Sequence, residues 1–521
     1  MTPDITPEAL GPEIIAPSTA GMTTRVVKGS LWTLAGQVLP LFATLLSTPL
    51  VIRFLGSESY GVLILVGLIP SYFAFADVGM GLASTKFASG AYAEGSPQRE
   101  SEFVWTSGLI ILISSLVVAI PLFLFSGWIV GELNVPDHVH TQASIGLKIT
   151  SAAFVISCLA GVFNTPELTR LRMDLNTVNT AASKFIIAIG APLFLYLGWG
   201  LLGAIWVGFF AGALALAGHF YFSSRLLPRL VKPAINFSLV RPLLKFGSGL
   251  LLAGIAAVFL VNLEKLLLTR MISVQSLAHY SVAYSFALMA TMFSSAMLQS
   301  LIPAFSQLLA PEKRTQFNAL YSRGIRLIVI SLLPAIMLMF VGARPFFTIW
   351  AGPEFGAGST LPFYILLVGL FFNILAYIPH GAIMASGRTD LFAKLYWIEL
   401  VIYASLAAAL IYEFQVPGAA MAWSLRVMLD AFVITWLAKR IAGVTFRFSN
   451  HLPSIIGGII ILVPTMVLTL YNNYSLWLIA LVPVSLLLYG LLIWQRGLEA
   501  DEIFWIRERL DRWLRLVRRR T

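Results

Sequence analysis

Long apolar stretches recur along this chain, separated by short polar turns. Each is long enough to cross about 30 Å of hydrocarbon as a helix, as residues 109–125 and 454–470 illustrate. We therefore predict an all-α, polytopic membrane protein with about 14 transmembrane helices. The predicted spans are 31–52, 60–80, 103–127, 143–163, 176–197, 200–222, 244–263, 279–303, 325–343, 361–383, 391–412, 416–437, 454–471 and 476–494.

The distribution of basic residues predicts which way the helices run. With fourteen spans, 29 of the 35 Lys and Arg fall on the side that holds both termini. Positive residues favour the cytoplasmic side of a membrane, so we expect both termini in the cytoplasm. The net charge of +11 is then mostly a topology signal rather than a sign of a nucleic-acid partner.

Three short motifs repeat in the same phase. Arg172-Met-Asp-Leu returns at Arg388, Trp206 returns at Trp423, and Arg53-Phe-Leu is matched at Arg270, with offsets of 216 or 217 residues. The offset spans six helices, so the two halves keep one orientation. We predict two six-helix lobes related by a parallel pseudo-two-fold axis, plus two C-terminal helices.

The segments that follow from this scheme have different expected roles. We expect a disordered cytoplasmic tail, an amphipathic C-terminal helix on the anionic inner leaflet, and a basic linker between the lobes. The boundaries are tail 1–24, N-lobe 25–222, linker 223–243, C-lobe 244–440, helices 13 and 14 at 441–494, and the basic amphipathic helix 495–521.

Composition argues against an enzyme and against metal or disulfide chemistry. Charged residues are only 11% of the chain and 58% of residues are hydrophobic, which does not fit a soluble domain. The sequence lacks nucleotide-binding, nucleophile-elbow and zinc-protease motifs, and Cys158 is its one cysteine. His138-Val-His140 is weak as a metal pair, and we expect no cofactor.

Ionisable groups inside predicted spans are the best candidates for function, because each is costly in hydrocarbon. Arg426 and Asp430 are one turn apart on helix 12, and Glu399 on helix 11 falls at a similar depth. One interpretation is a neutralised Arg-Asp pair that locks two helices together. The other is a cation that meets phosphate, with the carboxylates as proton or sodium sites.

Two more candidates lie in the first half. Lys148, near the start of helix 4, either faces a cavity or extends its ammonium to the membrane surface. Asp77, near the end of helix 2 beside Gly79 and Gly81, is either a gate or an ordinary helix-end carboxylate.

A second charged group is predicted at the outer end of helix 7. Glu264, Lys265 and Arg270 there either contact an anionic head group on release or sit in water. Arg53, at the outer end of helix 1, has the same two interpretations.

Four motifs resemble a known family. They begin at Arg53 (Arg-Phe-Leu-Gly-Ser-Glu-Ser-Tyr-Gly), Phe75 (Phe-Ala-Asp-Val-Gly-Met-Gly-Leu-Ala), Gly387 (Gly-Arg-Thr-Asp-Leu) and Pro417 (Pro-Gly-Ala-Ala-Met-Ala-Trp). Together they resemble the polysaccharide-export branch of the multidrug/oligosaccharidyl-lipid/polysaccharide flippase superfamily.

The resemblance implies a flippase rather than an enzyme. It implies alternating access that moves a polyprenyl-diphosphate-linked oligosaccharide to the outer leaflet of the bacterial cytoplasmic (inner) membrane, for export of surface polysaccharide such as O-antigen. The expected partners are that substrate, membrane lipids and, as further candidates, a polysaccharide polymerase and other assembly proteins. Two alternatives stay open: an ion-coupled multidrug or small-molecule antiporter of the same superfamily, and a non-transporting membrane scaffold.

Overall fold

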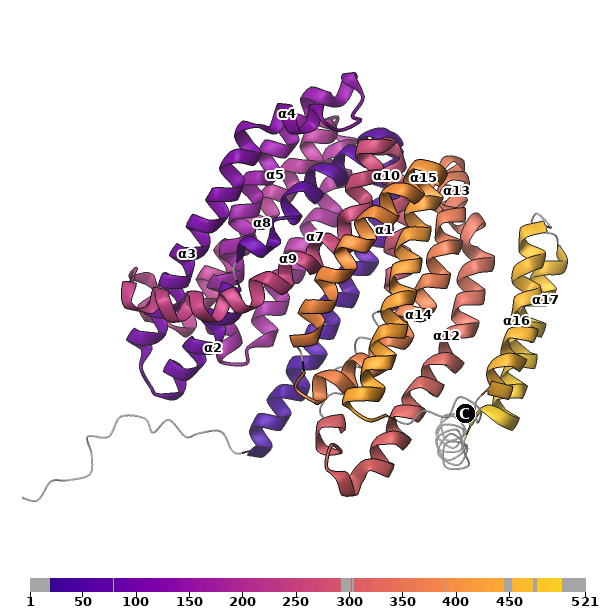
Figure 1. The fold of residues 1–521 in the computed structure, drawn as a ribbon. Coiled ribbons are helices and arrows are strands. Elements are labelled where there is room, and N and C mark those ends of the chain that lie inside the picture. Colours follow the sequence, from indigo (N-terminus) through magenta and orange to yellow (C-terminus); the bar gives the residue numbers. More distant parts are fainter. Residues whose placement is uncertain are drawn as a thin grey trace, which may run out of the picture. The chain divides into compact units, whose positions relative to one another are not determined.

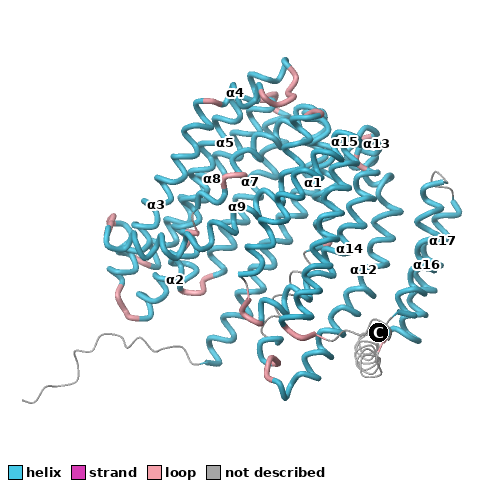
Figure 2. Tube along the Cα trace, viewed as in Figure 1, coloured by secondary structure: helices cyan, strands magenta, loops and turns pink. Residues whose placement is uncertain are grey.

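A computed structural model gives the fold of the chain, which is helical throughout the described part (Figures 1 and 2). It describes residues 19–498 except 78, 292–300, 302–303, 389, 445–451 and 472–475. No strand occurs among these residues. The predicted amphipathic helix after 498 and most of the predicted N-terminal tail lie outside the described residues.

The helices follow one another with short connections. In the first half they are α1 (Thr19–Ser71), α2 (Met80–Ala93), α3 (Pro97–Leu124), α4 (Ser126–Gly131), α5 (Asp137–Phe163), α6 (Thr165–Thr169), α7 (Met173–Tyr196) and α8 (Gly200–Leu226). In the second half they are α9 (Val240–Met271), α10 (Val274–Met289), α12 (Arg314–Ala351), α13 (Pro353–Gly358), α14 (Thr360–Ala385), α15 (Asp390–Ile441), α16 (Leu452–Tyr471) and α17 (Leu476–Leu492).

Many of these helices are long and apolar enough to span a membrane. Within the described residues, eight helices meet that condition by length and composition, and two shorter apolar helices lie near the C-terminal end. The chain is therefore a multi-pass membrane protein of the all-α class, as the apolar pattern predicts. The count of fourteen spans stays a prediction.

Some helices begin or end at other residues than the predicted spans. α1 starts at Thr19, inside the predicted tail. The span predicted at 60–80 ends at Ser71 and is followed by the short 3₁₀ helix η1 (Ala74–Asp77) and by α2. Gly79, with φ of 65°, supplies the left-handed turn between η1 and α2 that a hydropathy pattern does not reveal.

Helix boundaries repeat with the offset found in the sequence. α3 and α12 begin 217 positions apart, at Pro97 and Arg314, and α7 and α15 begin 217 apart, at Met173 and Asp390. These two pairs of helices therefore begin at equivalent positions of the two halves. This agreement in helix boundaries supports the internal repeat independently of the residue matches.

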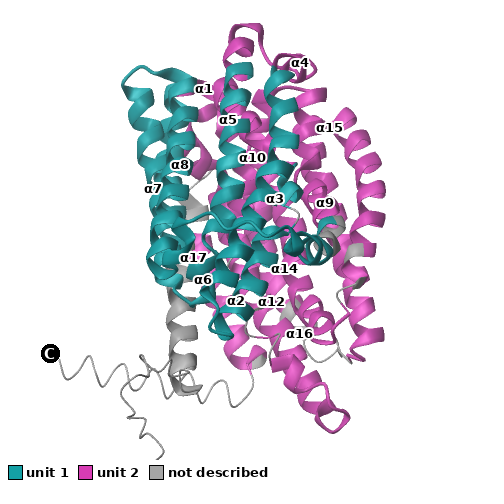
Figure 3. Ribbon diagram, turned by 90° about the vertical axis from the view of Figure 1, so that its left-hand side faces the viewer, with its two compact units in different colours: residues 1–54, 73–126, 144–251 teal, residues 55–72, 127–143, 252–521 magenta. Residues whose placement is uncertain are grey.

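Contacts divide the chain into two compact units, coloured in Figure 3. Unit 1 is 1–54, 73–126 and 144–251, and unit 2 is 55–72, 127–143 and 252–521. Within unit 1, α2 packs on α3 and α7 on α8; within unit 2, α14 packs on α15 and α16 on α17. Segments 55–72 and 127–143 group with the second half, whereas the predicted N-lobe was continuous. The predicted domain boundaries stay a prediction.

The bend between the last two helices of each repeat is left-handed in both halves. Gly198 lies between α7 and α8 with φ of 84°, and Gln415, 217 positions later, bends α15 with φ of 55° and ψ of −126°. Glycine adopts such angles freely, whereas a side chain with a Cβ is strained there. The second copy of the bend is therefore the strained one.

We predict that Gln415→Gly stabilises the protein. Relief of about 1 kcal/mol of backbone strain should raise the midpoint of thermal unfolding in detergent by roughly 2 °C. The matched change Gly198→Gln should lower the midpoint, because it puts a Cβ on a residue with positive φ. No other atom lies within 4 Å of that Cβ position, so backbone strain and not a clash would cause the loss. An unchanged or lower midpoint for Gln415→Gly would contradict strain at this bend.

Candidate functional site

A cluster of charged and tyrosine side chains lies within unit 2, on α9, α10 and both arms of α15. Glu399 and Tyr403 come from the first arm of α15, and Arg426 and Asp430 from the arm after the bend at Gln415. The bend folds the helix back, so that residues 27 positions apart in sequence, Glu399 and Arg426, face one another.

Arg426 is paired with Glu399 rather than with Asp430. Its Nη1 lies 3.6 Å from Glu399 Oε2, and the two side chains are only 14% and 12% exposed. The guanidinium also lies 5.3 Å from the centre of the Tyr403 ring, within cation–π range. The interpretation of a neutralised Arg426–Asp430 pair stays a prediction, and the ion pair that the structure shows for Arg426 is with Glu399, which was predicted at a similar depth.

This ion pair leaves polar atoms unsatisfied. Arg426 Nε, both Glu399 carboxylate oxygens and Asp430 Oδ1 are buried without a hydrogen-bond partner in the described structure. Buried polar groups in proteins are nearly always satisfied, so such groups are expected to interact with a ligand, an ion or water. The cluster thus has unused capacity for an anion at Arg426 and for a cation at the carboxylates.

Another Arg–Glu pair, in unit 1, shows what a fully made contact looks like. Arg170 donates two parallel hydrogen bonds to Glu100, one of them 3.0 Å from Nη2 to Oε2, and the Glu100 side chain is 1% exposed. Such a bidentate pair is strong and geometrically specific. By comparison, the pair of Arg426 and Glu399 is a loose contact without a hydrogen bond.

Glu264 is the most enclosed carboxylate of the cluster. It is 0% exposed and accepts hydrogen bonds from Tyr280 on α10 (3.1 Å) and Tyr403 on α15 (2.8 Å). The predicted end of helix 7 at 263 was wrong, because α9 continues to Met271 and carries Glu264 inside it. The interpretation of Glu264 as a water-exposed residue is therefore wrong too.

Lys265 extends the cluster through uncharged partners. Its Nζ donates to Asn262 Oδ1 at 2.8 Å and lies 4.5 Å from the centre of the Tyr284 ring. Tyr284 in turn packs edge-on against Trp423, three residues before Arg426 on α15. Lys265 is therefore held by an amide and an aromatic face.

The remaining predicted residues lie elsewhere. Arg270, on the last turn of α9, is exposed and 3.8 Å from Glu132. In unit 1, Lys148 lies 5.7 Å from the centre of the Phe123 ring, the Asp77 carboxylate accepts from the Gly81 amide at 3.3 Å, and Arg53 is exposed. The structure thus brings together Glu264, Lys265, Glu399, Arg426 and Asp430, and not these four.

Sequence reasoning missed the uncharged members of the cluster. Tyr280 and Tyr403 reach Glu264 from 16 and 139 positions away, and no local spacing announces such a contact. It also missed the buried pair of Glu167 and His219 in unit 1, whose atoms Oε1 and Nδ1 are 3.0 Å apart. The repeat comparison does not point to these residues; it indicates only that the charges of Arg426 and Asp430 belong to the second half, since positions 217 earlier hold Phe209 and Ala213.

Comparison with known proteins identifies the family. The model of the family described as "Polysaccharide biosynthesis protein" matches residues 26–309, more than half of the 521-residue chain. The chain belongs to this family. The resemblance to the polysaccharide-export branch of the flippase superfamily, predicted from the four motifs, is thereby confirmed.

Relatives of this family member agree with that assignment. A "Putative O-antigen transporter" of Shigella flexneri is 23% identical over 419 residues, covering 80% of this chain and 99% of the relative. Among solved structures, the lipid II flippase MurJ in an inward closed conformation has a TM-score of 0.67 at 14% identity, covering 89% of this chain and 98% of MurJ. An inward-facing multidrug resistance MATE transporter has a TM-score of 0.63 at 12% identity, covering 80% and 98%. The two solved structures establish the fold alone.

We predict that Tyr403→Phe destabilises the protein. The change keeps the ring and removes one donor to a fully buried carboxylate, which should cost about 1–3 kcal/mol and lower the midpoint of thermal unfolding in detergent. Tyr412→Phe is the matched control, because Tyr412 lies on the same helix and is 79% exposed. Equal midpoints for the two variants would show that Glu264 does not depend on the Tyr403 hydroxyl.

Proposed function

We propose that this protein flips a polyprenyl-diphosphate-linked oligosaccharide from the inner to the outer leaflet of the bacterial cytoplasmic membrane, by alternating access, for export of surface polysaccharide. Family membership is the observation that carries the proposal. The match to a putative O-antigen transporter over 99% of that protein and the fold shared with a lipid II flippase support it. In this proposal both termini are cytoplasmic and no covalent bond is made or broken.

The physical problem for such a carrier is the charged head group. A sugar diphosphate does not cross hydrocarbon unaided, because its charges and hydroxyls would lose their hydrogen bonds to water. The carrier has to offer a cation inside the membrane while the polyprenyl tail stays in lipid. Arg426 meets the chemical requirement, since its guanidinium has an unpartnered Nε and only a loose ion contact to Glu399.

Substrate and coupling ion can then act on the same pair. A phosphate that binds Arg426 displaces Glu399, and the released carboxylate is a site for a proton or a sodium ion. The cluster already holds three carboxylates, on Glu264, Glu399 and Asp430, against the two cations Lys265 and Arg426. Substrate and cation therefore favour each other's binding, which is the linkage that an ion-driven flippase needs.

The alternative function is an ion-coupled multidrug or small-molecule antiporter. The fold shared with a MATE transporter favours it as the second candidate. The cluster has one more carboxylate than it has cations. An organic cation would bind a carboxylate directly and would not require Arg426. A non-transporting scaffold would require none of these charges.

We predict that Arg426→Ala nearly abolishes surface polysaccharide while the protein still inserts into the membrane. Loss of charge-assisted contacts to phosphate, about 1.5–3 kcal/mol, should reduce export roughly 10- to 100-fold. Arg426→Lys should retain more export than Arg426→Ala, because it keeps a point charge while losing the planar guanidinium. The measurement is surface polysaccharide per cell, with membrane protein quantified in parallel.

The matched control for Arg426 is Arg440→Ala on the same helix. Arg440 is exposed and stacks 4.3 Å from the Trp436 ring centre, so its loss removes a basic charge without touching the cluster. Normal export by Arg426→Ala would refute the phosphate role. Drug extrusion by the wild type without any polysaccharide phenotype would favour the antiporter.

A second prediction concerns coupling. In proteoliposomes, transfer of a fluorescent lipid-linked oligosaccharide between leaflets, followed with an impermeant quencher, should speed up under an imposed proton or sodium gradient. Glu399→Gln should remove that response, since the amide keeps the shape and cannot bind the cation. Glu413→Gln, at an exposed position of the same helix, should respond like the wild type. Indifference of the wild type to both gradients would instead indicate uniport.

A further inference from the structure

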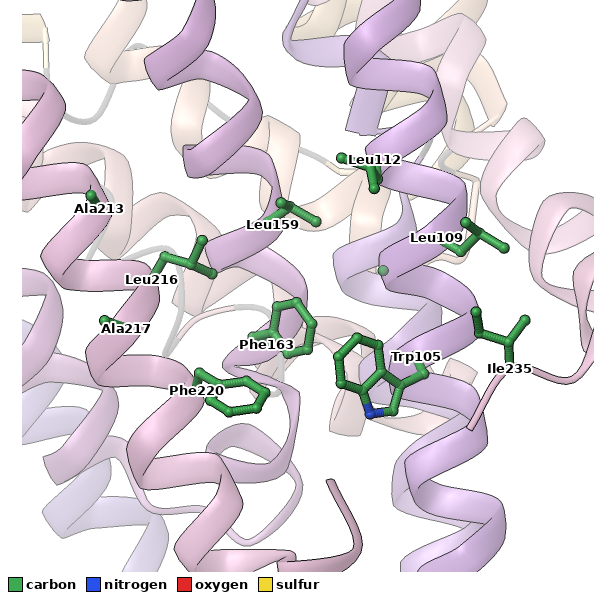
Figure 4. A pocket seen from close by; sticks show the side chains of 11 residues that line it. Trp105, Leu109, Leu112, Leu159, Phe163, Ala213, Leu216, Ala217, Phe220 and Ile235 are labelled. Atoms are coloured by element: carbon green, nitrogen blue, oxygen red, sulfur yellow. The ribbon is translucent and has the colours of Figure 1, made fainter. Parts of the chain in front are cut away.

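Unit 1 contains an apolar cavity that the proposed transport mechanism does not use (Figure 4). Its volume is about 550 Å³, and its walls come from α3, α5 and α8 together with Ile235 from the segment that follows α8. Pockets of this size typically hold one ligand molecule. The largest side chains of the lining are Trp105, Phe163 and Phe220.

The lining selects for a hydrocarbon chain. Its one polar side-chain group is the indole N–H of Trp105, which already donates to the Leu230 carbonyl at 3.0 Å. A sugar placed here would lose its hydrogen bonds to water without replacement, at a high cost for each hydroxyl. The cavity is therefore suited to an acyl or isoprenoid chain and unsuited to a glycan.

The segment 228–239, which we call the basic strap, is fastened along the start of α3. Besides the Trp105 bond, Ser101 donates to the Arg229 carbonyl at 3.4 Å, and Asn236 donates to Thr106 Oγ1 at 3.1 Å and to Glu102 at 2.9 Å. These bonds place Ile235 in the cavity wall. They also fix the backbone on which Arg229 and Lys232 stand.

The outward side of the basic strap combines positive and apolar side chains. Arg229 and Lys232 are exposed, as are Val231 and Phe237, at 61% and 76%. This combination is typical of segments that lie in a membrane interface, with apolar groups among the acyl chains and basic groups on anionic head groups. The one acidic neighbour in these contacts, Glu102, is hydrogen-bonded to Asn236 and Gln98.

We propose that the cavity and the basic strap form a binding site for an anionic phospholipid of the surrounding bilayer, with one acyl chain in the cavity and the phosphate on Arg229 and Lys232. The polar side chains beside the cavity, Ser101, Thr106 and Asn236, are occupied in holding the strap. With these side chains occupied, few hydrogen-bonding groups remain for sugar hydroxyls. A compact phosphate head group therefore fits the site better than the oligosaccharide head of the transported lipid. The bound lipid ties the strap, which joins the two halves of the repeat, to α3.

The test is a lipid titration of the delipidated full-length protein. Native mass spectrometry in detergent should show one retained phosphatidylglycerol and no comparable retention of phosphatidylcholine. The double variant Arg229→Gln/Lys232→Gln should bind phosphatidylglycerol roughly 30-fold more weakly, equivalent to about 1 kcal/mol for each charge removed. Lys184→Gln, at an exposed position of α7, should bind like the wild type.

A second variant tests the cavity independently of charge. Ala217→Trp fills the wall of the cavity and should abolish retention, whereas Ala182→Trp, at an exposed position of α7, should not. If Ala217→Trp lowers the midpoint of thermal unfolding, its loss of lipid could come from misfolding. The double variant Arg229→Gln/Lys232→Gln then decides the test. Equal binding of the two phospholipids, or undiminished binding by the charge variant, would refute the site. Retention of polyprenyl phosphate in place of phosphatidylglycerol would show that the carrier lipid, and not a bilayer phospholipid, is the occupant.

Discussion

The need to neutralise charge inside hydrocarbon organises unit 2. An ionised carboxylate without partners is strongly destabilised there, so each charge has to be met by a cation, a hydroxyl or an aromatic face. Glu264 is met by two tyrosine hydroxyls, Lys265 by an amide and a tyrosine ring, and Arg426 by Glu399 and a tyrosine ring. These contacts join α9, α10 and both arms of α15, so the arrangement of the helices depends on the same interactions that prepare the site.

The repeat shows how one helix arrangement serves two chemistries. The counterparts of Arg426 and Asp430, 217 positions earlier, are Phe209 and Ala213. Ala213 lines the apolar cavity of unit 1, whereas Asp430 belongs to the charged cluster of unit 2. The same position of the repeat thus lines an apolar cavity in the first half and holds a buried carboxylate with an unsatisfied oxygen in the second. The two halves of the repeat thus share helix boundaries but differ in the chemistry that their helices carry inside the membrane.

The sequence predicted features that depend on composition or on the spacing of repeated motifs. It missed contacts between side chains that are far apart in the sequence. Apolar length predicted a multi-pass helical protein, and equal offsets predicted the repeat of helix boundaries. The cost of charge in lipid predicted that Arg426 and Glu399 lie together. It did not predict Tyr403 as a partner of Glu264, because the two are 139 positions apart and tyrosine is common in any membrane helix. The sequence pattern also placed Glu264 beyond the end of helix 7, because adjacent Glu and Lys residues usually mark a membrane boundary. In the structure, hydrogen bonds from Tyr280 and Tyr403 allow Glu264 to be buried.

The quality of an ion pair separates a structural role from an exchangeable one. Arg170 and Glu100 form two parallel hydrogen bonds, and the Glu100 carboxylate is enclosed. Breaking the pair would therefore leave two buried charges without partners. Arg426 and Glu399 approach only to 3.6 Å and leave an Nε and both carboxylate oxygens without hydrogen bonds. A phosphate that reaches Arg426 would gain the hydrogen bonds that Glu399 does not make, and the released carboxylate would then need a proton or a cation as its new partner. Of these two described pairs, the loose one is the easier for an anion to open, and the tight one is suited to holding its helices together.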